Sequence, residues 1–500
     1  MHRRSRRPLT PRLVLASSAA LLLALTACGS RVDADTMARM NGQGVLVGTD
    51  GQPIAAGDGA VPGAVGGAPG SGAAGPGTGG EGTTTGGATG GGPGAGPASG
   101  GEAPVGEGAT AADGGVRAGS CAGFRNSTGI TDSEITIANI ADISGPVPGL
   151  FQSAQDATKA FVAYYNATTP DGICGRSLAL SALDTRSDSA GDQQAYTRAC
   201  SEAFAAVGSV SSQDQGGAAA AQGCGLPDLR AFTVTPQRSA CETCFSAYSI
   251  KPNLLAESFY SYWTDREPQA SQKVAVYYVD VPAAKVNAES FAAGWDAQGG
   301  ETVRVQGIAT SEFNYAPYAQ QMKDDGAGLV MYFGPFQFTI RLQEAMAQQG
   351  VDAIFLTDPT VYDSRYVQQG GEAVDGTFVY SVIQRFDDAR IPEMVLYRQW
   401  LERTAPGSVP NYYGLFAWSA ARLFVQKATE LGGKLTRPAL VQALRGVREW
   451  DSNGIHAPMQ VGAKTTPGCV KMLQLDGSTW KQVSPRDFLC GRVFDTGVGG

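Results

Sequence analysis

Small hydroxyl residues and glycines follow three apolar segments in the first half of the chain, where they could bind a ligand. They lie in Asp142-Ile143-Ser144, in Val207-Gly208 with Ser211-Ser212, and in Thr233-Val234-Thr235-Pro236-Gln237. Hydroxyls and free backbone N–H groups at helix starts suit a carboxylate or another oxygen-rich ligand. The alternative for any single loop is that Ser and Thr only cap a helix. Because three such loops would share one sheet edge, we expect a binding site there.

Catalytic side chains are scarce by comparison. The chain has two histidines, and His2 lies in the basic N-terminal segment, which leaves His456 as the one candidate base. His456 sits in the turn-like stretch 453–458, so a surface position is expected. No G-x-S-x-G elbow and no phosphate-binding G-x-x-x-x-G-K-[ST] loop occurs. We therefore expect a non-enzyme with no cofactor and no metal site, and keep an exported enzyme as a rival reading.

The N-terminus carries an export signal. Five arginines precede an apolar run over 13–27 that ends in Leu25-Thr26-Ala27-Cys28. A basic start, a short apolar middle and small residues before a cut are typical of a secretory signal peptide. The end resembles the lipobox of bacterial lipoproteins, which implies that residues 1–28 are a lipoprotein signal and that Cys28 receives acyl chains such as palmitate. An ordinary signal peptide cut nearby is the alternative, and the export route, general or twin-arginine, stays open.

The other cysteines are even in number. Nine cysteines occur in 500 residues, and Cys28 is assigned to the lipid. Eight in an exported chain predict four disulfides. Cys200–Cys224 and Cys469–Cys490 are the leading pairs, because the first would join adjacent helices and the second flanks the hairpin signal Asp476-Gly477. The remaining guesses are Cys121–Cys174 and Cys241–Cys244. The last pair has redox-motif spacing, but a structural loop is the preferred interpretation.

Charge and composition divide the chain further. Removing residues 1–28, with five arginines and no acid, takes the formal net charge from −8 to −13. Such an acidic surface argues against a nucleic-acid partner. Residues 29–118 are dominated by Gly, Ala and Pro and predict a disordered tether, whose reach for a flexible chain is roughly 50 Å.

From about residue 130 onward, short β-rich runs alternate with helical patterns. Strands are expected at 134–141, 177–183, 205–207 and 231–235, and then at 273–279, 301–305, 328–333 and 353–356. Helices are expected near 152–165, 190–204 and 337–349. This alternation predicts an α/β fold with parallel sheets built from βαβ crossovers. Because ~380 residues exceed one core, two Rossmann-like lobes are expected.

The order of these motifs resembles a known family. Ile143-Ser144-Gly145-Pro146, the turn at 172–176, the loop at 207–212 and the helix ending Gln349-Gly350 match type I periplasmic binding proteins of the leucine-binding kind, here of an actinobacterial type. The resemblance implies two lobes joined by a three-stranded hinge, with a cleft that closes on a small solute. The expected boundaries are 119–252 plus 380–456 for lobe 1, and 253–379 plus 457–500 for lobe 2.

The resemblance also implies site residues. Ser212 matches the serine that binds a ligand carboxylate. Members that bind amino acids have aromatic residues where this chain has Ala283 and Pro335, and their ammonium-binding acid falls at Pro359. Either Asp358, one residue earlier, replaces that acid or the ammonium grip is lost. The candidate ligand-binding residues are Ser144, Leu150, Phe151, Ser211, Ser212, Thr235, Gln237, Tyr278, Phe333, Phe336, Asp358 and Tyr362.

The function that the resemblance implies is solute capture for import. We expect a lipid-anchored binding protein on the extracellular face of the cell membrane that delivers a small molecule, of the amino acid type or another, to an ABC permease. The ligand itself is expected to be small, oxygen-bearing and largely apolar. The alternative is a ligand-sensing receptor of the same fold that signals to a membrane partner without transport.

Overall fold

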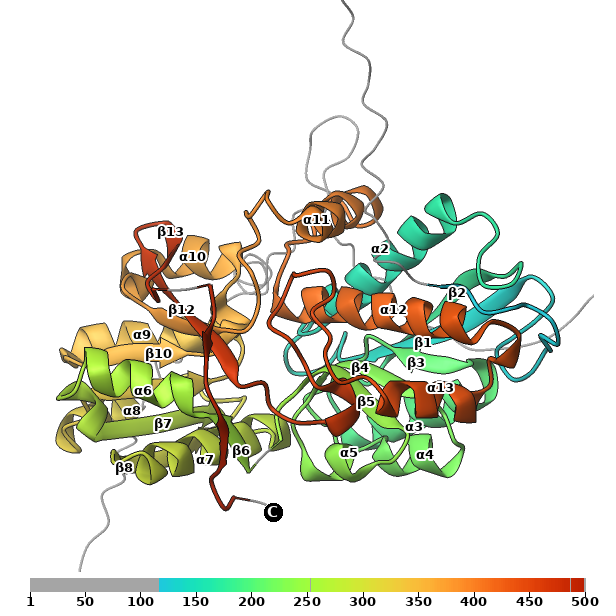
Figure 1. The fold of residues 1–500 in the computed structure, drawn as a ribbon. Coiled ribbons are helices and arrows are strands. Elements are labelled where there is room, and N and C mark those ends of the chain that lie inside the picture. The colour runs from blue at the N-terminus through green and yellow to red at the C-terminus, as the bar shows by residue number, and fades with distance from the viewer. Residues whose placement is uncertain (1–116, 252, 486, 499–500) are drawn as a thin grey trace, which may run out of the picture. The chain divides into compact units, whose positions relative to one another are not determined.

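The computed structural model describes residues 117–251, 253–485 and 487–498. The expected signal peptide, the acylation site Cys28 and nearly all of the expected tether over 29–118 lie outside the described residues. Two large sheets, each with its own covering helices, dominate the described part, and a two-stranded sheet accompanies them (Figure 1).

The first sheet is fully parallel and has the order β2-β1-β3-β4-β5. The inner strand β1 (EITIANIA) is buried at six of its eight residues, with Thr136 half-buried and Glu134 exposed, as expected for a strand covered on both faces. The bounds of the five strands are β1 Glu134–Ala141, β2 Ser177–Asp184, β3 Ala205–Val207, β4 Asp228–Thr233 and β5 Cys244–Ser249.

Helices from two distant parts of the chain cover this sheet. The early ones are α2 (Gln152–Thr168), α3 (Ser189–Glu202), α4 (Ala218–Gly223) and α5 (Pro236–Ala240), and the later ones are α11 (Pro392–Thr404), α12 (Tyr412–Leu431) and α13 (Arg437–Arg445). The long helix α12 packs against α2 and β4 (Figure 1). Asn411 starts α12 by accepting the N–H of Gly414 with its side chain. The first sheet and these helices are called lobe 1 below.

The second sheet is mixed, with the order β13-β12-β11-β10-β9-β7-β8, and β14 pairs with β12. The strands β7 to β11 run parallel to one another. In contrast, β12 runs antiparallel to β11 and forms a hairpin with β13, in which Asp476 pairs with Thr479. The bounds are β7 Lys273–Val279, β8 Glu301–Ile308, β9 Leu329–Phe333, β10 Ile354–Thr357, β11 Phe378–Ser381, β12 Cys469–Asp476, β13 Thr479–Gln482 and β14 Leu489–Cys490. The expected α/β fold is therefore confirmed, with an antiparallel edge added to the second sheet. The second sheet and its helices are called lobe 2 below.

The helices of lobe 2 follow the same alternation. They are α6 (Glu257–Arg266), α7 (Pro282–Ala297), α8 (Ala316–Asp324), α9 (Phe336–Gln349) and α10 (Ser364–Gly370). Helix α9 ends at Gly350, which has φ of 62°, a left-handed conformation that glycine adopts without penalty. Two short strands, β6 (Leu254–Ala256) and β15 (Val493–Asp495), pair beside them. Short 3₁₀ turns lie at 270–272, 359–361, 371–374, 432–434 and 461–463.

The chain passes between the two lobes three times, after β5, after β11 and before β12. The crossing segments are hydrogen bonded to each other. Ile383 forms an isolated antiparallel bridge with His456. The Lys251 N–H donates to the Thr466 hydroxyl at 2.9 Å. These contacts place all three crossings together, as a hinge requires.

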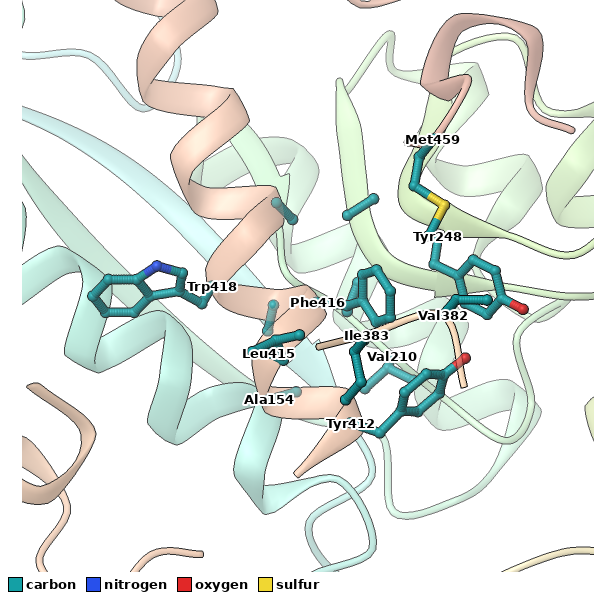
Figure 2. Packing of buried hydrophobic residues seen from close by; sticks show 14 of the residues in the cluster. Ala154, Val210, Tyr248, Val382, Ile383, Tyr412, Leu415, Phe416, Trp418 and Met459 are labelled. Atoms are coloured by element: carbon teal, nitrogen blue, oxygen red, sulfur yellow. The ribbon is translucent and has the colours of Figure 1, made fainter. Parts of the chain in front are cut away.

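The core of lobe 1 gathers around α12. Leu415, Phe416 and Trp418 of α12 are fully buried, with Tyr248 of β5 stacked on Phe416 at 5.1 Å between ring centroids (Figure 2). His456 packs against Phe416 with a centroid distance of 5.0 Å, and its Nε2 lies 2.8 Å from the Ser419 hydroxyl. The prediction of a surface histidine is therefore wrong: His456 is 1% exposed, because its turn-like segment is a crossing that packs beneath α12.

Four disulfides join the eight cysteines of the described residues. They are Cys121–Cys174, Cys200–Cys224, Cys241–Cys244 and Cys469–Cys490, the predicted pairing. In the part of the chain that the structure describes, no helix is both long and apolar enough to span a membrane.

Candidate functional site

A cavity of about 250 Å³ lies between lobes 1 and 2. Its lobe 1 wall comes from the loops that follow β1 and β3, from the end of β4, and from Tyr413 at the start of α12. Its lobe 2 wall comes from residues at the carboxyl ends of β7, β9 and β10 and from the first turns of α7. This is where parallel α/β sheets place their ligands. Both lobes therefore contribute strand ends to one concave site.

Behind the lobe 1 wall lies a carboxylate that is already satisfied. Asp142, directly after β1, has no exposed surface. Its Oδ2 accepts the backbone N–H of Ser212 at 2.8 Å and the hydroxyl of Ser212 at 2.6 Å. Its Oδ1 accepts the hydroxyl of Thr185. The expectation that Ser212 holds a ligand oxygen is therefore corrected, because both donors of Ser212 point to a side chain of the protein itself.

The lobe 2 wall contains a second, less satisfied carboxylate. Asp358 follows β10, is 9% exposed and accepts the Thr360 N–H at 3.0 Å. Asp358 forms no ion pair with any of the described residues. Burial raises the pKa of the Asp358 carboxyl to about 6, against the opposing hydrogen bonds from Thr360. Nearby Asn287 is 4% exposed and its Oδ1 accepts no hydrogen bond from the described residues.

Aromatic rings supply much of the apolar lining. Phe151 and Tyr413 meet edge to face with centroids 4.6 Å apart, and Phe232 lies 6.2 Å from Tyr413. Phe333, at the end of β9, faces them from lobe 2 as part of the same lining. Burial raises the pKa of Tyr413 well above its ordinary range, and the Asp358 and Asp142 carboxylates act in the same direction. Tyr413 is therefore a neutral phenol that lies close to both acids.

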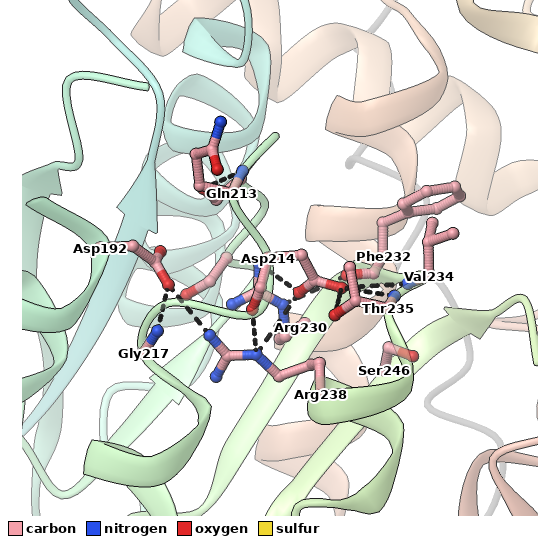
Figure 3. A network of polar contacts seen from close by, with 12 residues as sticks. Asp192, Gln213, Asp214, Gly217, Arg230, Phe232, Val234, Thr235, Arg238 and Ser246 are labelled. Atoms are coloured by element: carbon pink, nitrogen blue, oxygen red, sulfur yellow. Dashed lines mark hydrogen bonds and ion pairs between the residues drawn. The ribbon is translucent and has the colours of Figure 1, made fainter. Parts of the chain in front are cut away.

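A buried ionic network supports the loop that carries Ser211 and Ser212 (Figure 3). Asp214 accepts the N–H groups of Val234 and Thr235, each at 3.1 Å, which ties the loop after β3 to the loop after β4. Arg238 donates to Asp192 at 3.1 Å and lies 3.4 Å from Asp214. The network thus fixes two neighbouring loops of the cavity wall without reaching into the cavity.

Six of the twelve predicted site residues line this cavity: Leu150, Phe151, Ser211, Ser212, Phe333 and Asp358. Ala283 and Pro335, the two departures from the family pattern, line it as well. Pro359 does not, so the acid that reaches the cavity is Asp358.

The other six lie elsewhere, for identifiable reasons. In lobe 1, the Ser144 hydroxyl donates to Asp184 at 2.6 Å, Thr235 is bound to Asp214, and Gln237 is exposed on α5. In lobe 2, the Tyr278 ring lies against Gly307, Phe336 lies under the Arg365 guanidinium, and Tyr362 stacks on Phe386 at 4.9 Å. Tyr362 belongs to a separate cleft, lined also by Arg398 and Trp480.

Several lining residues escaped the sequence reasoning. Asn287 is polar, and Phe232 and Tyr413 supply aromatic surface. Asp142, which lies behind the lining residue Ser212, was missed as well. A carboxylate directly after a buried strand was a usable signal for Asp142. Tyr413 carried no local signal, because α12 joins lobe 1 from more than 150 residues further along the chain.

Comparison with known proteins agrees with this architecture. A family profile described as periplasmic binding protein matches residues 134–479. The fold and the site define a two-lobed solute-binding class, and the chain belongs to the periplasmic binding protein family. A search of curated protein sequences finds no match.

Solved structures share the fold at low sequence identity. A fatty acid ABC transporter substrate-binding protein from Thermomonospora curvata has a TM-score of 0.63 at 14% identity, covering 72% of this chain and 94% of that one. The isoleucine complex of a branched-chain amino acid transporter binding protein from Streptococcus pneumoniae has a TM-score of 0.59 at 15% identity, with 71% and 100% covered. A solute-binding protein from R. palustris in complex with 4-hydroxybenzoate has a TM-score of 0.58 at 16% identity, with 73% and 97% covered.

Proposed function

We propose that this protein is an extracellular, lipid-anchored solute-binding protein that captures a small molecule between its lobes and delivers it to an ABC permease. The observation that carries the proposal is the cavity of about 250 Å³, whose walls come from strand ends of both sheets. Three crossings that are hydrogen bonded to each other support a hinge between those walls. The family match adds support, because its members bind solutes outside the cytoplasm.

We propose that the lobes divide near the three crossings, close to the expected bounds of 119–252 plus 380–456 and 253–379 plus 457–500. The strand β11 carries lobe 2 on to Ser381. Leu150, Phe151, Ser211, Phe333 and Asp358 are proposed to contact the solute, because each of them lines the cavity. Phe151 and Phe333 come from different lobes, so closure of the cleft would bring apolar surface onto the solute from both sides.

The binding step is tested with the full chain carrying Cys28→Ala, which lacks the acylated thiol. Native mass spectrometry of the purified protein should reveal a bound small molecule, and adding that molecule should raise the melting temperature. If no molecule co-purifies and none in a broad solute library raises the melting temperature, the solute-binding function is refuted.

Anchoring and delivery need cell-based tests. Cys28→Ala should move the protein from membranes to the soluble fraction, and unchanged membrane retention would contradict acylation at Cys28. Deleting the gene should abolish uptake of the labelled solute. Normal uptake together with a lost transcriptional response to the solute would favour the sensor instead of the transport protein.

A further inference from the structure

The two donors that Ser212 presents at the cavity wall are not free for an anionic ligand. Ser212 supplies the N–H and hydroxyl that the family resemblance assigns to a ligand carboxylate, and both donate to Asp142 at 2.8 and 2.6 Å. A carboxylate accepts hydrogen bonds only, so it needs donors that are free. The Asp142 side chain therefore stands in for the ligand carboxylate in this half of the site.

The charges around the cavity have one sign. No lysine, arginine or histidine is found in its described lining, whereas Asp280 and Asp358 are. Asp142, which lies behind Ser212, is a third carboxylate near the cavity. An anion entering this cavity would lose its hydration and meet only negative charge, which is unfavourable in a partly buried site.

Asp358 is the acceptor best placed for a cationic group. It is 9% exposed, and Thr360 is the residue that donates hydrogen bonds to its carboxylate. Asn287 adds a buried Oδ1 that has no donor among the described residues. Two buried acceptors without cationic partners match a ligand that brings N–H donors and a positive charge.

The rest of the lining is apolar and aromatic. Leu150, Phe151, Phe232 and Phe333 contribute carbon surface, and Tyr413 adds a further ring to the lining. Aromatic faces attract organic cations as well as apolar groups. The ligand therefore needs an apolar body attached to its charged end.

We propose that the solute is an organic amine with an apolar or aromatic body and no carboxylate, whose ammonium group binds Asp358. This inference rests on the proposed solute-binding function and names the chemical class of its ligand. It also assigns Asp142 the role of excluding amino acids by using the donors that would bind their carboxylate.

The test compares matched probes on the full-length Cys28→Ala protein by titration calorimetry at pH 7.5. The amines are 2-phenylethylamine, cyclohexylamine and isopentylamine, and the corresponding acids are 3-phenylpropionate, cyclohexanecarboxylate and 4-methylpentanoate. Phenylalanine and leucine carry both groups. We expect at least one amine to bind at least tenfold more tightly than its matched acid and than either amino acid.

Two variants locate the determinants. Asp358→Asn should weaken amine binding at least tenfold, whereas Asp476→Asn, which changes an exposed carboxylate in the β12–β13 turn, should leave it unchanged. Asp142→Ala should free the Ser212 donors and improve phenylalanine or leucine binding at least tenfold. Asp142→Asn keeps an acceptor for Ser212, so it is the matched control and should leave phenylalanine and leucine binding unimproved.

Acidification provides an independent readout. Asp358 acts electrostatically on five buried, neutral tyrosines: Tyr248, Tyr332, Tyr380, Tyr412 and Tyr413. Asp280 lines the same cavity, and no lysine, arginine or histidine is found in its described lining. Because Asp358 must be ionised to hold an ammonium group, amine affinity should fall between pH 7 and pH 5.

The outcomes separate the two proposals. Preferred binding of an acid or an amino acid, or an amine affinity unaffected by Asp358→Asn, overturns the ligand class while solute binding stands. Absence of binding by any amine, when a co-purified acid or neutral solute is found, overturns it equally. Absence of any ligand of any charge refutes the solute-binding function itself.

Discussion

Arg238 donates to the Asp228 carboxylate at 2.9 Å, and neither side chain has any exposed surface. The same guanidinium also contacts Asp192 and Asp214, so Arg238 pairs with three buried acids (Figure 3). Arg230 is the second cation of the network and pairs with Asp214. Burial raises the pKa of Asp192 to about 6 and raises that of Asp228, although both arginines oppose the shift. Burying these charges carries a desolvation penalty, which is offset only when every ion pair of the network is formed.

Removal of this cation should destabilise lobe 1 severely. Arg238→Met keeps much of the side-chain volume but leaves three buried acids with Arg230 alone, and should lower the free energy of unfolding by about 3–5 kcal/mol. The matched control is Arg198→Met, which breaks an exposed i,i+4 pair with Glu202 and should cost less than about 1 kcal/mol. Urea unfolding measures both, and equal effects would show that the network contributes no special stability.

The buried histidine should make stability depend on pH. Burial lowers the pKa of His456 to about 4, below its ordinary value of 6.5. Between these values the unfolded chain binds a proton that the folded protein does not. The contribution of His456 is therefore complete above pH 6.5 and is lost as the pH falls toward 4, by roughly 3 kcal/mol in all.

The comparison with His456→Gln isolates this contribution. The raised pKa values of Asp192 and Asp358 act in the opposite direction, but both proteins share them and they cancel in the difference. Urea unfolding between pH 4.5 and 7.5 should show a shallower loss of stability on acidification for the variant. Parallel curves for the two proteins would rule out His456 as the source.

The four disulfides should differ in their contributions according to the length of chain that each one closes. Cys121–Cys174 spans 53 residues and Cys241–Cys244 only 3. Loop-closure entropy predicts losses of about 4 kcal/mol and about 1.6 kcal/mol when each pair is replaced by alanine. Chemical unfolding of the two double variants checks the order. A larger loss from the short pair would mean that native packing, rather than chain entropy, governs its contribution.

Apolar contact in the cavity should govern part of the affinity. Leu150 is half-buried and lines the cavity, so Leu150→Ala should weaken binding of the co-purified solute by roughly tenfold through lost apolar burial. Gln237→Ala, at a predicted site residue that lies outside the cavity, is the control and should change the dissociation constant less than about twofold. A similar loss for both variants would place the binding site elsewhere.

The sequence was sufficient for elements whose signals are local. β1 begins at Glu134 as predicted, because its apolar run has sharp polar limits. The hairpin signal Asp476-Gly477 does join β12 to β13, and it brings Cys469 and Cys490 into register across β12 and β14. These outcomes depend on neighbours within a few tens of residues.

Features that depend on tertiary packing could not be read in the same way. His456 lies in a turn-like sequence, yet α12 and a crossing segment bury it. Phe336 follows a cavity residue by one position, but as the first residue of α9 it lies under Arg365. The hydrogen bond from Ser212 to Asp142 joins residues that are 70 positions apart, so no local sequence pattern predicts it.

The Cys121–Cys174 disulfide determines where mechanical force would enter the folded part of the chain. Gly119 and Ser120 also bond to the end of α12 through Thr429 and Gly433. A pull on the chain from its N-terminal side would therefore reach the turn before β2 and the end of α12 without first straining β1. If the protein is anchored through Cys28, drag on the solute-binding unit would be borne by a covalent bond at the rim of lobe 1, and the cleft would stay free to open and close under load.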